Sequence, residues 1–229
     1  MPFRRVAAVI FDMDGLLFDT ERLYSDAMMM AATEMGASLT PAAVHRTIGL
    51  PAADCTAIWA EHLPPGFDVG AFWSASSANF TTLAETQLTL KAGAIELLDL
   101  LAHLNLPCAI ATSSGRATVD HHLTKAGIAE RFGTIVAYGD YAQGKPHPAP
   151  YAAAARRLDV DPARCLALED SYNGVRSAAA AGMITIMVPD LLEATQEMRE
   201  LSVQVVRDLH DVCALLEGRG RETDSFQAF

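Results

Sequence analysis

The 229-residue sequence has few cysteines, and no two of them stand close together. Because Cys55, Cys108, Cys165 and Cys213 are far apart, the chain has neither a CxxC redox pair nor the paired cysteines of a zinc knuckle. Its seven histidines form no HExxH or similarly close spacing. We therefore expect reduced, structural thiols, and the sequence offers no site for zinc.

Long apolar runs and an excess of positive charge are also missing. The first apolar run, residues 6–11, ends at Asp12 and is shorter than a signal-peptide core or a membrane span. The formal net charge of −11 disfavours nucleic acid and anionic membranes as partners. A small anionic substrate stays compatible, since it needs only a local positive site. We expect a soluble, cytoplasmic protein, monomeric by default.

The sequence does contain short apolar runs that alternate with helical patterns. Such runs suit strands that are buried on both faces of a parallel sheet. Strands are predicted at residues 6–11, 107–111, 134–137, 165–168 and 184–188. Helices are predicted at residues 94–104, 119–126, 151–158 and 175–181, the first with Ile95, Leu98 and Leu101 on its buried face. This alternation predicts an α/β fold with a Rossmann-like parallel sheet.

One region breaks the alternation, because residues 16–90 contain no convincing buried strand. Helical patterns cover residues 20–35, 42–47, 52–62 and 69–85, with glycine and proline between them. An insertion of this kind after the first strand predicts an all-helical cap domain over the carboxyl edge of the sheet. The predicted domains are a core of residues 1–16 and 91–217, a helical cap of residues 17–90, and a polar tail of residues 218–229.

Acidic residues follow two of the predicted strands. Asp12 and Asp14 come directly after the first strand, and Glu169 and Asp170 follow the run at residues 165–168. Unpaired buried carboxylates are costly, and ligands of open α/β sheets bind at the carboxyl ends of the strands. A cluster of oxygen ligands is typical of Mg²⁺. The four acids therefore predict a magnesium site at this edge.

Two further segments could bind an anion at the same edge. Thr112 and Ser113 lie in an ATSSG turn after a predicted strand, where hydroxyls and backbone N–H groups can hold phosphate. Lys145 lies in GKPHP, before a predicted helix. Taken alone, these are as well explained by an ordinary helix cap and a solvated lysine. Together with the acids, they indicate metal-assisted phosphoryl transfer.

These motifs give the sequence a family resemblance. In order, spacing and strand context, DMDG at residues 12–15, Thr112, Lys145 and the Glu169-Asp170 pair resemble the haloacid dehalogenase-like hydrolase superfamily. The flanking segments are most similar to its β-phosphoglucomutase-like branch of small-molecule phosphatases with a helical cap. The resemblance extends over residues 6–216.

The resemblance implies a role for each motif. Asp12 would be the nucleophile that forms an aspartyl-phosphate, and Asp14 would protonate the leaving oxygen and later accept a proton from water. Thr112 and Ser113 would hold the phosphoryl group. Lys145 would offset the charge between the nucleophile and the phosphate.

The metal site is implied in the same way. Mg²⁺ would bind the Asp12 carboxylate, the Asp14 backbone carbonyl and Asp170. Glu169 would contact it directly or in the outer shell, and the resemblance does not decide between these two possibilities.

We therefore expect a Mg²⁺-dependent phosphatase acting on a small phosphorylated metabolite, either a sugar phosphate or a nucleotide-derived monophosphate. Asp14 argues against a dehalogenase, because a halide leaves without protonation. A sugar phosphomutase is the alternative, although Tyr24 and Ala52 stand where such mutases carry a cap histidine and, three residues after a glycine matched by Gly49, a cap arginine. A non-enzymatic phosphoacceptor module is more remote. Candidate substrate residues of the cap are Glu21, Tyr24 and Arg46.

Overall fold

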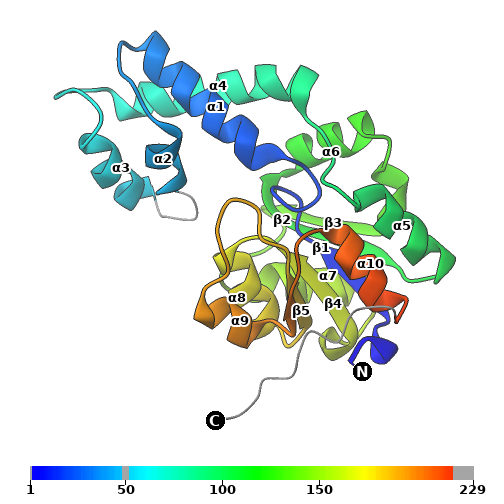
Figure 1. Cartoon of the computed structure of the whole chain (residues 1–229). Helices are drawn as coiled ribbons and strands as arrows, with labels where there is room; N and C mark the ends of the chain where they lie inside the picture. The colour runs from blue at the N-terminus through cyan, green and yellow to red at the C-terminus, as the bar shows by residue number, and fades with distance from the viewer. Residues whose placement is uncertain (1, 48–51, 219–229) are drawn as a thin grey trace.

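Six parallel strands form one sheet in the computed structural model, which describes residues 2–47 and 52–218. The strand order across the sheet is β3-β2-β1-β4-β5-β6 (Figure 1). The strands are β1 (Ala8–Phe11), β2 (Cys108–Gly115), β3 (Thr134–Tyr138), β4 (Cys165–Glu169), β5 (Ile184–Met187) and β6 (Gln204–Val205). The predicted Rossmann-like parallel sheet is confirmed. β6 was not predicted, because two residues make no recognisable apolar run.

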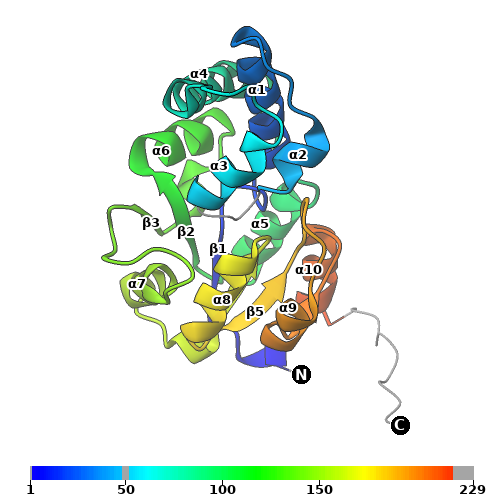
Figure 2. The ribbon, with the colours of Figure 1, turned by 90° about the vertical axis from the view of Figure 1, so that its left-hand side faces the viewer.

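Helices cover both faces of this sheet (Figures 1 and 2). They are α5 (Ala94–His103), α6 (Arg116–Lys125), α7 (Ala149–Leu158), α8 (Tyr172–Ala180), α9 (Gln196–Leu201) and α10 (Leu209–Leu216). Successive side chains of β1 point to opposite faces, so Val9 and Phe11 pack in one core cluster with α5, α6 and α10, whereas Ala8 and Ile10 pack in another with α7 and α8. This burial on both faces explains why β1 is apolar throughout.

Among the described residues, four helices lie between β1 and α5 in sequence, beyond the carboxyl end of the sheet (Figure 2). They are α1 (Thr20–Glu34), α2 (Pro41–His45), α3 (Ala52–Ala60) and α4 (Val69–Gln87). We call residues 20–87 the cap segment. It has an apolar cluster of its own, in which Trp59 is fully buried and contacts the rings of Phe72 and Trp73. The division of the chain into separate domains stays a prediction.

The two connections between the sheet and the cap segment run side by side. The backbone N–H of Asp19 donates to the carbonyl of Thr89, and that of Lys91 donates to the carbonyl of Leu17. Phe18 and Leu90 form an antiparallel bridge between these hydrogen bonds. The first residues of α1 are therefore tied directly to the start of the segment that leads into α5.

The buried face of α5 differs from the prediction. Ile95 is 39% exposed, while Ala94, Leu97, Leu98 and Leu101 are buried. The buried positions follow the i, i+3, i+4, i+7 spacing of an amphipathic helix, which places position 95 on the solvent side. α9 and α10 were not predicted at all. The predicted tail lies outside the described residues from residue 219 onward.

No helix within residues 2–47 and 52–218 is both long and apolar enough to cross a membrane.

Candidate active site

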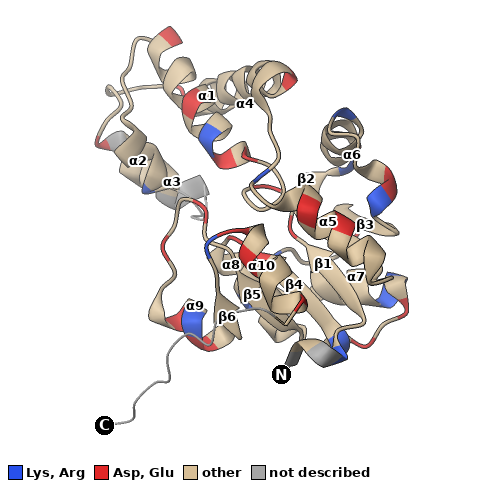
Figure 3. Cartoon of the chain, turned by 45° about the vertical axis from the view of Figure 1, so that its right-hand side comes forward, with Lys and Arg blue, Asp and Glu red and all other residues tan. Residues whose placement is uncertain are grey.

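Carboxylates from two neighbouring strands meet at the carboxyl edge of the sheet. The backbone N–H of Asp12, just after β1, donates to the carbonyl of Leu168 in β4 at 3.0 Å, which sets the two strand ends level. One carboxylate oxygen each from Asp12, Glu169 and Asp170 lies within 4.8 Å of the others, and all three residues are buried. Figure 3 shows acidic residues in the loops between the sheet and the cap segment. Three of the four acids named from the sequence thus lie together, whereas the Asp14 carboxylate is not in this group.

Lys145 is the buried cation of this cluster. It follows β3 and precedes α7, and its Nζ donates to Asp12 Oδ1 and, at 2.5 Å, to Glu169 Oε1. Its side chain is only 6% exposed. The solvated-lysine alternative is therefore wrong, because this ammonium group lies between two carboxylates with almost no contact with solvent.

Glu169 is held by donors of the chain itself. Its Oε1 accepts from Tyr151 Oη at 2.7 Å as well as from Lys145, and its Oε2 accepts from the backbone N–H and the hydroxyl of Ser171 at 3.2 and 3.0 Å. A Cβ on Gly174 would lie 1.8 Å from Oε1, so glycine is needed for α8 to approach this carboxylate. The sequence analysis missed Tyr151, which no motif marks, and Ser171, whose position as the N-cap of α8 was a usable signal.

Asp170 has the opposite environment. Its carboxylate is buried, and Oδ1 has no hydrogen-bond partner. A Cβ on Gly15 would lie 2.2 Å from Oδ2, so the DMDG loop packs directly against this side chain. A buried carboxylate oxygen without a donor is costly. Beside Asp12, it fits the oxygen-donor set of a magnesium ion.

The charges of the cluster do not balance. Burial raises the pKa of the Asp12 carboxyl to about 8, with Glu169 and Asp14 adding to the rise and Lys145 opposing it. Burial and the Asp12 charge also raise the pKa of Asp170 well above its usual range. Burial lowers the pKa of Lys145, but the Asp12 and Glu169 carboxylates outweigh it and hold that pKa above its usual value. One lysine is therefore too little to keep these acids ionised, and a bound cation would supply the missing charge.

This imbalance predicts how stability depends on pH when no divalent cation is bound. The pKa of Asp12 is about 8 in the folded protein, against an ordinary value of 3.8. Protonated Asp12 therefore contributes fully to stability below pH 3.8, and this contribution is lost as the pH rises through about 8. In EDTA, the melting temperature should fall between about pH 5 and about pH 8, and less steeply in Asp12→Asn. Mg²⁺ should also flatten this slope. Equal slopes for the wild type and the variant would contradict the prediction, and scanning fluorimetry measures both.

Hydroxyl groups from the end of β2 surround Asp14. Ser114 Oγ donates to Asp14 Oδ2 at 2.6 Å, and Thr112 Oγ1 lies 3.5 Å from the same oxygen. Thr112 is buried, and its Oγ1 accepts the backbone N–H of Ser114 at 3.0 Å. Ser113, which the sequence analysis grouped with Thr112, is exposed, and the nearby Tyr141 hydroxyl donates to the Thr112 carbonyl at 3.1 Å. Ser114 was missed, although it lies in the same hydroxyl-rich turn.

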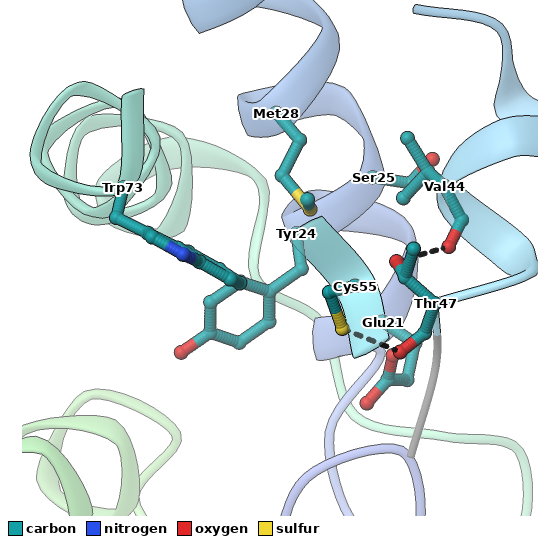
Figure 4. Close-up of a pocket in the computed structure, with 8 residues that line it drawn as sticks. All are labelled: Glu21, Tyr24, Ser25, Met28, Val44, Thr47, Cys55 and Trp73. Carbon is teal, nitrogen blue, oxygen red and sulfur yellow. Dashed lines mark hydrogen bonds between the residues drawn. The ribbon is translucent and has the colours of Figure 1, made fainter. Parts of the chain in front are cut away.

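The cap residues named from the sequence separate into two places. Glu21 and Tyr24 line a cavity between the cap helices (Figure 4). Burial, with the charges of Asp14 and Asp190, raises the pKa of Glu21 to about 7. Arg46 instead pairs with Glu61 at 3.2 Å, and both side chains are more than half exposed. Gly49, used in the comparison with mutases, lies outside the described residues.

Known proteins resemble the chain over most of its length. A family model described as haloacid dehalogenase-like hydrolase matches residues 9–188. Over 216 residues the chain is 34% identical to the probable pseudouridine-5′-phosphatase of Drosophila melanogaster, covering 91% of this chain and 92% of the relative. Over 196 residues it is 30% identical to hexitol phosphatase B of Escherichia coli K12, covering 81% and 85%.

A solved structure agrees with these matches. The crystal structure of a Thermotoga maritima protein, provisionally assigned as a beta-phosphoglucomutase, superposes with a TM-score of 0.80 at 27% identity. The superposition covers 93% of this chain and 99% of the other. The similarity thus includes both the sheet and the cap segment.

Proposed function

We propose that this chain hydrolyses a small phosphorylated metabolite through an aspartyl-phosphate on Asp12. The premise is that the chain belongs to the haloacid dehalogenase-like hydrolase family and is a phosphoric monoester hydrolase of its β-phosphoglucomutase-like branch. The substrate would be a sugar phosphate or a nucleotide-derived monophosphate. The observation that carries the proposal is the buried contact of Lys145 with Asp12 and Glu169, beside the unpartnered Asp170 oxygen. This arrangement supplies a nucleophile, a fixed cation and a place for a second cation within one site.

In the first step, a carboxylate oxygen of Asp12 attacks phosphorus. An Asp12 O–P bond forms while the bond between phosphorus and the leaving oxygen breaks, and Asp14 gives its proton to that oxygen. Ser114 donates to Asp14 Oδ2 and so orients the carboxyl group. Thr112 and the N–H groups of its turn would bind the phosphoryl oxygens, with Ser113 at the exposed side of the turn.

In the second step, water attacks the phosphorus of the aspartyl-phosphate. The Asp12 O–P bond breaks, the carboxylate is restored, and the water proton passes to Asp14. Lys145 stays beside Asp12 throughout, because its other hydrogen bond, to Glu169, fixes it in place. Its charge offsets the negative charge that the nucleophile and the phosphate bring together.

Magnesium is part of the proposal. The carboxylates of Asp12 and Asp170 would hold it, together with the Asp14 backbone carbonyl, and it would supply charge neutralisation between the anionic nucleophile and the anionic substrate. The donors that surround both Glu169 oxygens support an outer position for that residue, where it holds Lys145.

Phosphate release from a panel of phosphorylated metabolites tests this function. We expect release from a few substrates in Mg²⁺ and a loss of at least about 100-fold in EDTA, because the cluster lacks positive charge without the metal. Restoration by added Mg²⁺ is the control for irreversible unfolding. Conversion of a hexose 1-phosphate to its 6-phosphate without net phosphate release would instead favour the mutase.

The proposed partners follow from the same reasoning. The ligand is a small phosphorylated metabolite, and the net charge of −11 supports neither nucleic acid nor an anionic membrane as a partner. We propose a monomer, which sedimentation equilibrium would test.

A further inference from the structure

The cavity between the cap helices has a chemical character that narrows the substrate. It encloses about 560 Å³ including its mouth, and α1 contributes Glu21, Tyr24 and Met28 to its wall (Figure 4). Thr47 and Trp73 line it from the C-terminal side of α2 and from α4. The wall thus combines a carboxylate, hydroxyl groups and two aromatic rings.

This cavity lies next to the proposed catalytic groups. Glu21 is in the first turn of α1, and its Cγ lies 3.3 Å from the position that a Cβ on Gly15 would take. The charge of Asp14 contributes to raising the pKa of Glu21 and, after burial, that of Tyr24 to about 12. A leaving oxygen protonated by Asp14 would therefore place the rest of the substrate against Glu21 and Tyr24.

No cation lines this cavity among the residues that the structure describes. Residues 48–51, outside that part of the chain, read Ile-Gly-Leu-Pro and carry no charge either. The neighbouring cations already have acidic partners, since Arg46 pairs with Glu61 and Lys91 pairs with Asp190 at 2.6 Å. The Lys91 charge also acts on Glu21, but burial and the charges of Asp14 and Asp190 outweigh it. A second phosphate or a carboxylate on the substrate would meet the Glu21 carboxylate without a compensating positive group.

The aromatic rings are held in place and remain open to a ligand. Tyr24 stacks on Phe80 at 3.9 Å between ring centroids, and Trp73 meets Trp59 edge-on at 4.8 Å. Tyr24 and Trp73 are nevertheless each 40% exposed. Rigid, partly exposed aromatic rings beside hydroxyl groups suit a partner with a flat or apolar face and polar edges.

We propose that this cavity selects phosphate monoesters whose leaving group is uncharged, hydroxylated and flat or apolar on one face, as in a polyol or a nucleoside. The inference rests on the proposed function and identifies its substrate class. Glu21 is the specificity-determining residue: it accepts hydrogen bonds from substrate hydroxyls and rejects a second anionic group. Bisphosphates and phosphorylated carboxylic acids are poorer substrates of this site.

Matched substrate pairs test the selection, assayed at about two pH units above the Glu21 pKa of about 7, where this carboxyl group is ionised. The pairs are glycerol 3-phosphate with 3-phosphoglycerate, glucose 6-phosphate with glucose 1,6-bisphosphate, and uridine 5′-monophosphate with uridine 3′,5′-bisphosphate. We expect kcat/KM for the uncharged leaving group to exceed that of its anionic partner by about 10-fold or more, the size of an uncompensated like-charge contact near a protein surface. Comparison of kcat/KM for glycerol 3-phosphate and for uridine 5′-monophosphate shows whether a polyol or a nucleoside is the better leaving group.

Two glutamate variants on α1 separate charge from structure. Glu21→Gln should lower the ratio of the two kcat/KM values within each pair by about 10-fold, because it removes the repulsion between the carboxylate and the anionic substrate. Glu34→Gln is the matched control, because that carboxylate bonds Asn79 at 3.2 Å and does not line the cavity. In Glu34→Gln, the ratio of kcat/KM values within each pair should equal that of the wild type.

Three results contradict the inference, and they are distinguishable. Hydrolysis of p-nitrophenyl phosphate in Mg²⁺, together with equal or better rates on the anionic partners, would overturn the selection and leave the phosphatase intact. No release from p-nitrophenyl phosphate or any pair would overturn the proposed function itself. If Glu21→Gln left the ratio of kcat/KM values within each pair unchanged, Glu21 would not determine the specificity.

Discussion

Replacement of Asp12 by Asn should lower kcat by about 10⁴-fold or more, because the amide cannot form the aspartyl-phosphate. The exchange keeps the shape of the side chain and removes one negative charge from a cluster that has too many. The variant should therefore fold, and without metal it should melt at or above the wild-type temperature near neutral pH. Steady-state phosphate release and scanning fluorimetry measure the two effects.

The control for this variant is Asp99→Asn on α5. Asp99 pairs with Arg131 at 2.7 Å, and its side chain is 59% exposed. Its loss should leave kcat unchanged and alter stability by at most about 1 kcal/mol, as for other surface ion pairs. If Asp12→Asn kept more than about a tenth of the wild-type kcat, the nucleophile would have to be another group.

Replacement of Lys145 by Met should reduce both activity and stability. The variant would leave Asp12 and Glu169 buried without their shared cation, and breaking a buried ion pair by removing one partner costs about 3–5 kcal/mol. We expect a fall of that size in the free energy of unfolding in EDTA, measured by urea titration, and a fall of about 10³-fold or more in kcat in Mg²⁺.

A double variant tests whether the stability loss comes from the stranded charge. Lys145→Met with Glu169→Gln should recover part of it, because the amide still accepts from Tyr151 and no longer carries a buried charge. Lys125→Met is the matched control, since Lys125 is one-third exposed and pairs with Glu85 on the surface. A loss as large in Lys125→Met as in Lys145→Met would contradict the argument from burial.

Most of the sheet was predictable because its strands are buried on both faces. Such strands are continuous apolar runs, and the runs that contain Val9, Ile110 and Leu166 were recognisable without any tertiary information. The helices of the cap segment were predictable from glycine and proline punctuation. α10 was missed although Asp208 precedes it and the buried Leu209 and Val212 follow at helical spacing, so a signal existed that was not used.

The candidate site was predictable only as far as its motifs. Strand ends identify Asp12, Asp14, Glu169 and Asp170, because the parallel topology carries them to one edge. The contact of Tyr151 with Glu169 depends on the way α7 lies against the sheet, which no local pattern specifies. Ile95 shows the same limit, since two apolar faces of α5 were possible and only packing against β1 and α10 selects one.

The position of β1 has a consequence for biosynthesis. Val9 pairs with Cys108 on one side and with Leu166 on the other, so β1 leaves the ribosome long before either neighbour exists. The helices of the cap segment are complete by residue 87, before any partner of β1 has been made. Glu169 and Asp170 come later still, so a chain that stops before β4 has Asp12 and Lys145 without these two acids. Nascent and truncated chains therefore expose an apolar strand that lacks a sheet partner, and such exposed strand edges favour aggregation.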